Sequence, residues 1–268
     1  MTRQATQYHF GISLASLIPQ NVFFPIEEIV EALAELGFEF LQGGPFRGVS
    51  GYENFAIPVK YKEPTWNGVD SLSQALFGQG DDFEKADLKD WLAFPETWIA
   101  DQVFHRLPGR VVSHEFSAGD RLVELNPKIK MTAEKIVDKC QREGYDLVID
   151  TKHMFEDNAK FDPLFDRMPN HFGRTVDEKL AKIRIISPSV DLLHVKATDG
   201  LDRRILDEFL RSPHRQQLDV LAEYPPIARA MDIPKMFASA GFRQQKRTEA
   251  LEYASHFLHR LKNIFNQN

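Results

Sequence analysis

The sequence predicts an α/β fold built on a parallel sheet. Short apolar segments of strand length alternate along the chain with amphipathic segments long enough to form helices. Strands separated by helices of about ten or more residues are typical of parallel strands joined by crossover helices. Several apolar segments also run directly into a carboxylate or an imidazole, and these residues are Glu115, Asp150, His194 and Glu223. Polar groups at successive strand ends are typical of a functional site in a parallel α/β protein.

The predicted strands and helices follow one another in a regular order. Pro25 opens the first helix, whose apolar residues recur at three- and four-residue spacing, and Gly37 closes it. Strands of mainly apolar residues are predicted at 8–14, 38–41, 110–116, 145–150, 190–196 and 218–223. Further helices with one apolar face are predicted near 132–143, 175–186 and 201–211, and from about 247 onward.

The region between residues 47 and 108 lacks this order. Much of it is rich in Gly, Pro, Asn and aromatic residues, and its periodicity is poor. Ala56 to Tyr61 is a candidate strand, which Pro58 would confine to an edge or a bulge. One strand-and-helix unit is therefore irregular or missing in this region. Because no low-complexity linker divides the chain, we expect a single domain over residues 1–268.

Composition and charge narrow the class of partner. The chain has 33 Lys and Arg against 39 Asp and Glu, and its net charge of −6 argues against general nucleic-acid binding. Its single cysteine, Cys140, can form no internal disulfide, which fits a reducing cytosol. Neither a signal peptide nor an apolar run of membrane-spanning length is recognisable. We therefore expect a cytoplasmic protein whose partner is a small molecule rather than a nucleic acid or a membrane.

The polar residues at the four strand ends form a candidate metal site. Each is separated from the next by about one strand, helix and loop, which would place them on successive strands around a barrel. Carboxylate oxygens together with one imidazole suit Mn²⁺, Mg²⁺ or Co²⁺, and Zn²⁺ as well. For each position taken alone, the ordinary alternative is an acidic residue that caps a helix or a His that packs in the core. The combination of all four residues favours the metal site.

The same segments resemble the xylose-isomerase-like TIM barrels, the sugar isomerase and epimerase superfamily, and in particular its ketose 3-epimerases. Asp150-Thr151-Lys152-His153-Met154 is similar to their Asp-Thr-x-His-Met segment, in which Asp binds metal and His contacts substrate. Leu193-His194-Val195-Lys196 resembles a later His-bearing strand. Ala222-Glu223-Tyr224-Pro225 resembles the final strand, whose Glu completes the metal site. The resemblance implies a TIM (β/α)8-type barrel with Glu115 as the other metal-binding Glu.

This resemblance also implies an activity. It indicates a divalent-metal-dependent isomerase or epimerase that converts a small sugar-like substrate through an enediolate. Glu115 and Glu223 would then be the acid/base pair on opposite faces of the substrate. His153 would orient a substrate hydroxyl, and the other candidate substrate-binding residues are Lys152, Lys196, His114, His9 and Arg47. Relatives are often dimers or tetramers, so a homo-oligomer is a further expectation.

The two lysines bear on the charge of the substrate. Lys152 and Lys196 follow Asp150 and His194 closely, and two cations beside one metal favour a substrate that carries phosphate or carboxylate. The alternative is that each lysine pairs with a neighbouring carboxylate, such as Glu156 or Asp199.

Two other classes of function stay open. Endonuclease-IV-type DNA repair uses the same barrel but needs a cluster of additional His and Glu ligands for several zinc ions. Of the nine histidines, only His9, His114, His153 and His194 lie near predicted strand ends. The second alternative is a barrel that has lost catalysis and acts as a binding or scaffold protein. A metal bound at the strand ends would argue against this alternative.

Overall fold

The computed structural model describes residues 6–17, 24–43, 55–62, 109–116, 119, 121–126, 129, 131–152, 175–224 and 232–267. Within these residues, parallel strands follow one another in chain order as a closed barrel, β1 to β8. The strands are β1 Gln7–Ser13, β2 Phe40–Gln42, β3 Val59–Lys62, β4 Arg110–Ser113, β5 Leu122–Leu125, β6 Asp146–Asp150, β7 Val190–Val195 and β8 Gln217–Ala222. The predicted (β/α)8-type barrel class is confirmed.

Backbone packing divides the chain into two compact units. The first consists of Met1–His9, Val111–Ala222 and Arg260–Asn268, and the second consists of Phe10–Arg110 and Glu223–His259. The expectation of a single domain over residues 1–268 therefore stays a prediction.

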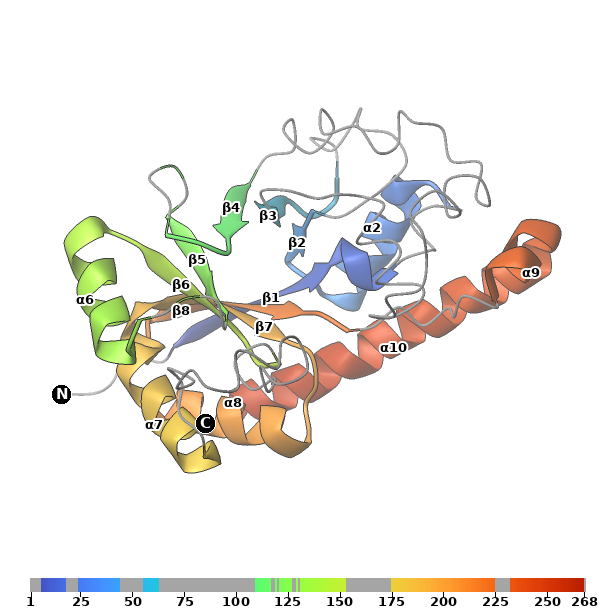
Figure 1. The fold of residues 1–268 in the computed structure, drawn as a ribbon. Coiled ribbons are helices and arrows are strands. Elements are labelled where there is room, and N and C mark those ends of the chain that lie inside the picture. Colours follow the sequence, from blue (N-terminus) through green and yellow to red (C-terminus); the bar gives the residue numbers. More distant parts are fainter. Residues whose placement is uncertain are drawn as a thin grey trace. The chain divides into compact units, whose positions relative to one another are not determined.

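The first unit contains the strands β5 to β8 and the helices between them. These helices are α6 Ala133–Glu143, α7 Val176–Ile186 and α8 Gly200–Arg211, close to the predicted ranges. Helix α7 packs against both α6 and α8, and Figure 1 shows these helices beside the strands that they connect. Side chains fix where the helices begin: Thr132 accepts the Lys135 N–H at the start of α6. Thr175 and Glu178 form a capping box on α7.

The connection between β4 and β5 departs from the predicted rhythm. Val112 pairs with Leu122 and Ser113 with Val123, so β4 and β5 are parallel neighbours. Only residues 114–121 join the two strands, which is shorter than the usual crossover of a dozen or more residues. Strand β5 itself was not predicted, because four residues without a flanking helical pattern give little periodic signal.

The second unit contains most of β1, together with β2 and β3. Gly11 pairs with Phe40 and Leu41 pairs with Val59, both in parallel register. Strand β3 overlaps the candidate strand that the sequence indicated from Ala56 to Tyr61. The predicted helix is α2, Ile26–Leu36, which follows Pro25 and ends at Gly37 with a φ of 93°. This left-handed conformation explains the glycine, because other residues adopt it at a cost.

The two C-terminal helices are α9, Ile233–Ala238, and α10, Ala240–Asn266. Helix α10 begins before the predicted residue 247. The Ser239 hydroxyl oxygen accepts the Phe242 backbone N–H at 3.2 Å and so caps its first turn. The early part of α10 is mostly polar or exposed, which explains why apolar spacing did not reveal it.

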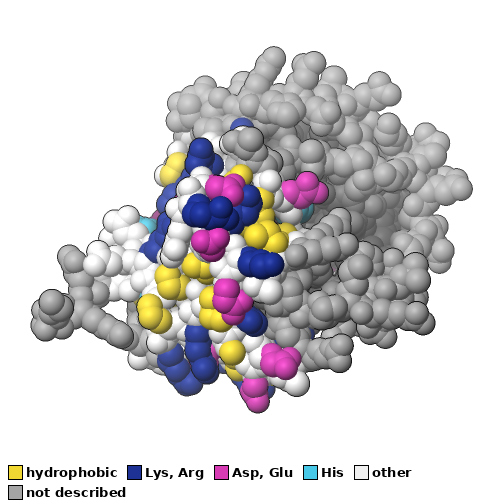
Figure 2. All heavy atoms as spheres, turned by 60° about the vertical axis from the view of Figure 1, so that its left-hand side comes forward, with side chains coloured by type: hydrophobic (Ala, Val, Ile, Leu, Met, Phe, Trp, Pro, Cys, Tyr) yellow, Lys and Arg dark blue, Asp and Glu magenta, His cyan; other side chains and the backbone are white. Residues whose placement is uncertain are grey.

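The described surface carries charges of both signs. On the face in Figure 2, Lys and Arg side chains are interspersed with Asp and Glu. Helix α6 contributes exposed pairs one turn apart, Lys139 with Glu143 and Arg142 with Asp138. Such pairs keep a surface hydrated and contribute little to stability. In the part of the chain that the structure describes, no helix has both the length and the apolar character needed to span a membrane.

An ion pair between α7 and α8 predicts a pH-dependent contribution to stability. Arg184 Nε donates a hydrogen bond to Glu208, and this bond holds the pKa of Glu208 below its ordinary value. A carboxyl with a lowered folded-state pKa stabilises the fold above its unfolded-state pKa. That contribution is lost as the pH falls through the folded-state pKa. We therefore expect Glu208→Gln to lower the Tm at neutral pH.

The difference in Tm between Glu208→Gln and the wild type should become smaller as the pH falls below about 4. Thermal unfolding of both proteins, recorded from neutral to acidic pH, measures this difference. Asp138→Asn is the matched control, because Asp138 belongs to an exposed pair on α6, and it should change the Tm less. A Tm difference for Glu208→Gln that stays constant with pH would contradict the prediction.

Candidate metal centre

Three neighbouring strands of the first unit place polar side chains on one face. Glu124 lies on β5, Asp150 ends β6 and His194 lies on β7. Asp150 pairs with His194, and Glu124 pairs with Val148, two residues before Asp150. Paired residues of adjacent strands share a face, as do residues two apart along one strand. Strand register alone therefore brings Glu124, Asp150 and His194 to the same side.

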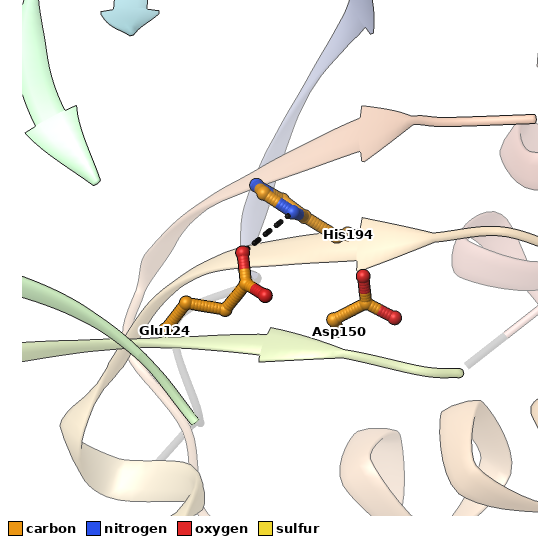
Figure 3. Close-up of side chains that lie close together, drawn as sticks. All are labelled: Glu124, Asp150 and His194. Atoms are coloured by element: carbon orange, nitrogen blue, oxygen red, sulfur yellow. Dashed lines mark ion pairs between the residues drawn. The ribbon is translucent and has the colours of Figure 1, made fainter. Parts of the chain in front are cut away.

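These three side chains form a compact, buried group. One potential ligand atom from each lies within 4.8 Å of the others, and each residue is at most 4% exposed. His194 Nδ1 lies 3.4 Å from Glu124 Oε2, the pair joined by the dashed line in Figure 3. Figure 3 also shows Asp150 beside them, at the end of its strand. Two carboxylates and one imidazole are ligands that divalent cations use, so this group can hold a metal ion.

Both oxygens of the Asp150 carboxylate have a donor beside them. The backbone N–H of Lys152 donates to Asp150 Oδ1 at 2.7 Å. The Lys196 ammonium lies 3.0 Å from Asp150 Oδ2. The Lys196 backbone N–H in turn donates to Thr151 Oγ1 at 3.2 Å, and Thr151 N–H donates to the His194 carbonyl at 2.9 Å. These bonds hold the ends of β6 and β7 together and orient Asp150.

A further acidic residue lies next to this network. Asp202, in the first turn of α8, lies close enough to Thr151 and Asp150 for both residues to act on its pKa. Burial raises the pKa of Asp202, Thr151 partly opposes this shift, and the charge of Asp150 adds to it. The neighbourhood of Asp150 is therefore rich in negative charge, which favours the binding of a cation.

His114 lies near the second carboxylate oxygen of Glu124. Its Nε2 is 3.9 Å from Glu124 Oε1, and its side chain is about half exposed. Asn126 holds this arrangement, because its amide donates to the carbonyl oxygens of His114 at 2.9 Å and of Glu124 at 3.1 Å. The Glu124 carboxylate therefore faces one buried and one exposed imidazole.

The structure brings together two of the four residues predicted as ligands, Asp150 and His194. Glu115 is exposed after β4, where its backbone N–H donates to Ser113 Oγ at 3.2 Å. Glu223 is the half-buried residue that follows β8, and it does not belong to the three-residue group. The ligand and acid/base roles of all four residues stay predictions.

The predicted substrate-binding residues are distributed more widely. His9 is half-buried on β1, Lys152 is exposed after β6, and Lys196 is the partner of Asp150. His114 lies beside Glu124, as described above. His153 and Arg47 lie outside the described residues. Their proposed contacts with substrate stay predictions.

Glu124 was not singled out from the sequence. It stands inside the run Leu122-Val123-Glu124-Leu125-Asn126, where an acidic residue interrupts an apolar segment. The available signal was this isolated charge in a buried context, since a carboxylate rarely lies in a core without a partner. Glu115 was predicted as the ligand instead, because it follows a strand with a clearer apolar pattern.

No protein-family model matches the chain, and no curated protein matches it in sequence. Solved structures resemble it at low identity. L-ribulose 3-epimerase has 12% identity and a TM-score of 0.39, over 94% of this chain and 97% of that one. A protein described as a candidate sugar phosphate isomerase/epimerase, from Anabaena variabilis ATCC 29413, has 9% identity and a TM-score of 0.44, over 96% and 99%.

A mutant tryptophan synthase from M. tuberculosis has 10% identity and a TM-score of 0.25, over 94% of this chain and 93% of that one. At these TM-scores the similarities carry no conclusion about activity or site residues. The barrel assignment rests on the strand order of the chain itself.

Proposed function

We propose that this protein is a divalent-metal-dependent isomerase or epimerase of a small sugar-like substrate. The observation that carries the proposal is the buried group of Glu124, Asp150 and His194 on three neighbouring parallel strands. Two carboxylates and one imidazole whose ligand atoms lie within 4.8 Å of one another are a donor set that divalent cations use, and this arrangement supports a metal site. The segment from Asp150 to Met154, which resembles the ketose 3-epimerases, supports the same class.

The reaction needs residues that bind the metal and residues that transfer protons. A divalent ion held by the three side chains would coordinate adjacent carbonyl and hydroxyl oxygens and acidify the C–H next to the carbonyl. One carboxylate must then remove the proton and another acid must return a proton. We assign to Glu124 the roles expected of Glu115, because Glu124 is buried beside the other ligands whereas Glu115 is exposed. The second acid/base role, which the resemblance gives to Glu223, stays a prediction.

The Lys196–Asp150 contact changes the argument about substrate charge. Two lysines near one metal favour an anionic substrate only if they lack another counter-charge. Lys196 has such a counter-charge in Asp150, at 3.0 Å. The contact is compatible with both kinds of substrate, because a metal bound at Asp150 would release Lys196 toward an anionic group. We propose that neutral sugars and sugar phosphates be tested side by side.

Solvent exchange tests the proposed reaction whichever product forms. The metal-loaded protein is incubated in D₂O with a panel of ketoses and their phosphates, and NMR follows the C–H groups next to each carbonyl. We expect deuterium to enter at one such carbon of at least one substrate, because proton removal by a carboxylate exchanges with solvent.

His194→Ala is the control for this experiment, because it removes the only nitrogen ligand of the three-residue group. It should abolish the exchange. A wild-type protein that binds metal stoichiometrically, yet exchanges no C–H group and converts no substrate of the panel, would overturn the proposed activity. That result would favour the non-catalytic barrel instead.

A further inference from the structure

The Asp150 carboxylate is engaged by two donors of different kinds. The side chain is 1% exposed, and its oxygens lie beside the Lys152 backbone N–H and the Lys196 ammonium. The backbone donor cannot leave without a change in the chain after β6. The ammonium stands on a flexible side chain that is 20% exposed, so it has a route to solvent. Of the two donors, Lys196 is the one that can move.

A divalent cation bound by Asp150 would compete with this ammonium. Both are cations that require the same buried carboxylate, and in a site of low dielectric constant their mutual repulsion is only weakly screened. His194 and Glu124 complete the ligand group within 4.8 Å, so a metal held by these three side chains would share Asp150 with the ammonium. Binding of the metal at full strength therefore requires Lys196 to turn away from Asp150.

We infer that Lys196 is a built-in competitor of the metal, which neutralises Asp150 when no divalent ion is bound and lowers the affinity of the site. This inference rests on the metal site of the proposed function and adds a residue that sets its affinity. It follows from the Nζ–Oδ2 distance of 3.0 Å and from the burial of the carboxylate. The ammonium thereby stabilises the metal-free site by balancing the charge of the buried Asp150 carboxylate.

Titration with Mn²⁺ tests the inference, with the free ion followed by electron paramagnetic resonance. Lys196→Met keeps an unbranched side chain, one heavy atom shorter than lysine, and removes its charge. We expect Lys196→Met to bind Mn²⁺ about tenfold more tightly than the wild type, or better, because the metal no longer displaces a charge-assisted contact. Lys196→Arg keeps the cation and should bind within about threefold of the wild type.

Lys152→Met is the matched control for general electrostatics. Lys152 is exposed, and it contacts Asp150 through its backbone N–H, which methionine retains. This variant removes the same charge two residues from Asp150, and we expect its affinity to change less than about threefold. Circular dichroism checks that each variant is folded, and Lys196→Gln replaces Lys196→Met if the methionine variant does not fold.

The outcomes separate this inference from the proposed function. If the wild type binds Mn²⁺ and neither Lys196→Met nor Lys196→Gln binds it more tightly, the inference is wrong while the metal site stands. An equal gain in Lys152→Met would also overturn it, because the effect would then be general charge. If neither the wild type nor any variant binds Mn²⁺, both the metal site and the competition are wrong.

Discussion

Glu124→Gln is expected to weaken divalent-metal binding by about 100-fold or more, because it replaces an anionic ligand with a neutral amide. Glu124 is 4% exposed, and its carboxylate lies 3.4 Å from the imidazole of His194. Asp150 is the other carboxylate of the three-residue group, so the variant leaves that group with a single anionic ligand. Metal titration of the purified variant, with elemental analysis of the protein as isolated, measures the effect.

Glu115→Gln is the matched control, since it makes the same chemical change at the residue that the sequence favoured. Glu115 is exposed and turns back onto Ser113 through its backbone. Glu115→Gln should bind the divalent metal with an affinity within about twofold of the wild type, because exposed charges are well screened. Loss of metal from Glu115→Gln with retention by Glu124→Gln would reverse our assignment and restore the set of ligands predicted from the sequence.

Gly11→Ala is expected to destabilise the fold by about 3 kcal/mol, at the upper end of the range for an overpacked core. Gly11 lies on β1 opposite Phe40 on β2, and an added methyl group would overlap the Phe40 ring. That ring is buried and packs edge-on against Tyr61, with centroids 5.5 Å apart. Phe40 therefore cannot move aside without disturbing a second buried aromatic. Chemical denaturation monitored by circular dichroism measures the loss.

Two further variants locate the cause of this effect. Gly241→Ala, in the first turn of α10, adds a methyl group whose nearest neighbour is Ser239 Oγ at 3.9 Å. It should be neutral or stabilising by up to about 1 kcal/mol, because alanine favours a helix over glycine. Combining Gly11→Ala with Phe40→Leu should recover part of the loss by making space at the ring. No recovery in this double variant would argue against the proposed overlap.

Most helices and strands of the described residues were predictable, because their signals are local. Helix α2 shows apolar residues at helical spacing between Pro25 and Gly37, and its buried residues are those of that stripe. Strand β6 is an apolar run that ends in Asp150, and β7 is similar up to His194. Spacing along the chain, together with capping residues, carries the information needed for such elements.

The strand and the site residue that the sequence did not predict, β5 and Glu124, also have physical explanations. Strand β5 is four residues long and is joined to β4 by a short connection, so neither its length nor its surroundings set it apart. Because Glu124 lies on β5, it was not predicted as a site residue either. His153 and Arg47 lie outside the described residues, and their predicted contacts with substrate stay predictions.

The amino-acid order by itself determined the alternation of strands and helices and the presence of Asp150 and His194 at strand ends. Both follow from which residues are neighbours along the chain. Which carboxylate joins them was decided only in three dimensions, because β5 pairs with β6 and carries Glu124 to their face. The partner of Lys196 was decided in the same way, by the register that sets His194 against Asp150. Contacts across strands depend on pairing partners and register, and local spacing contains neither.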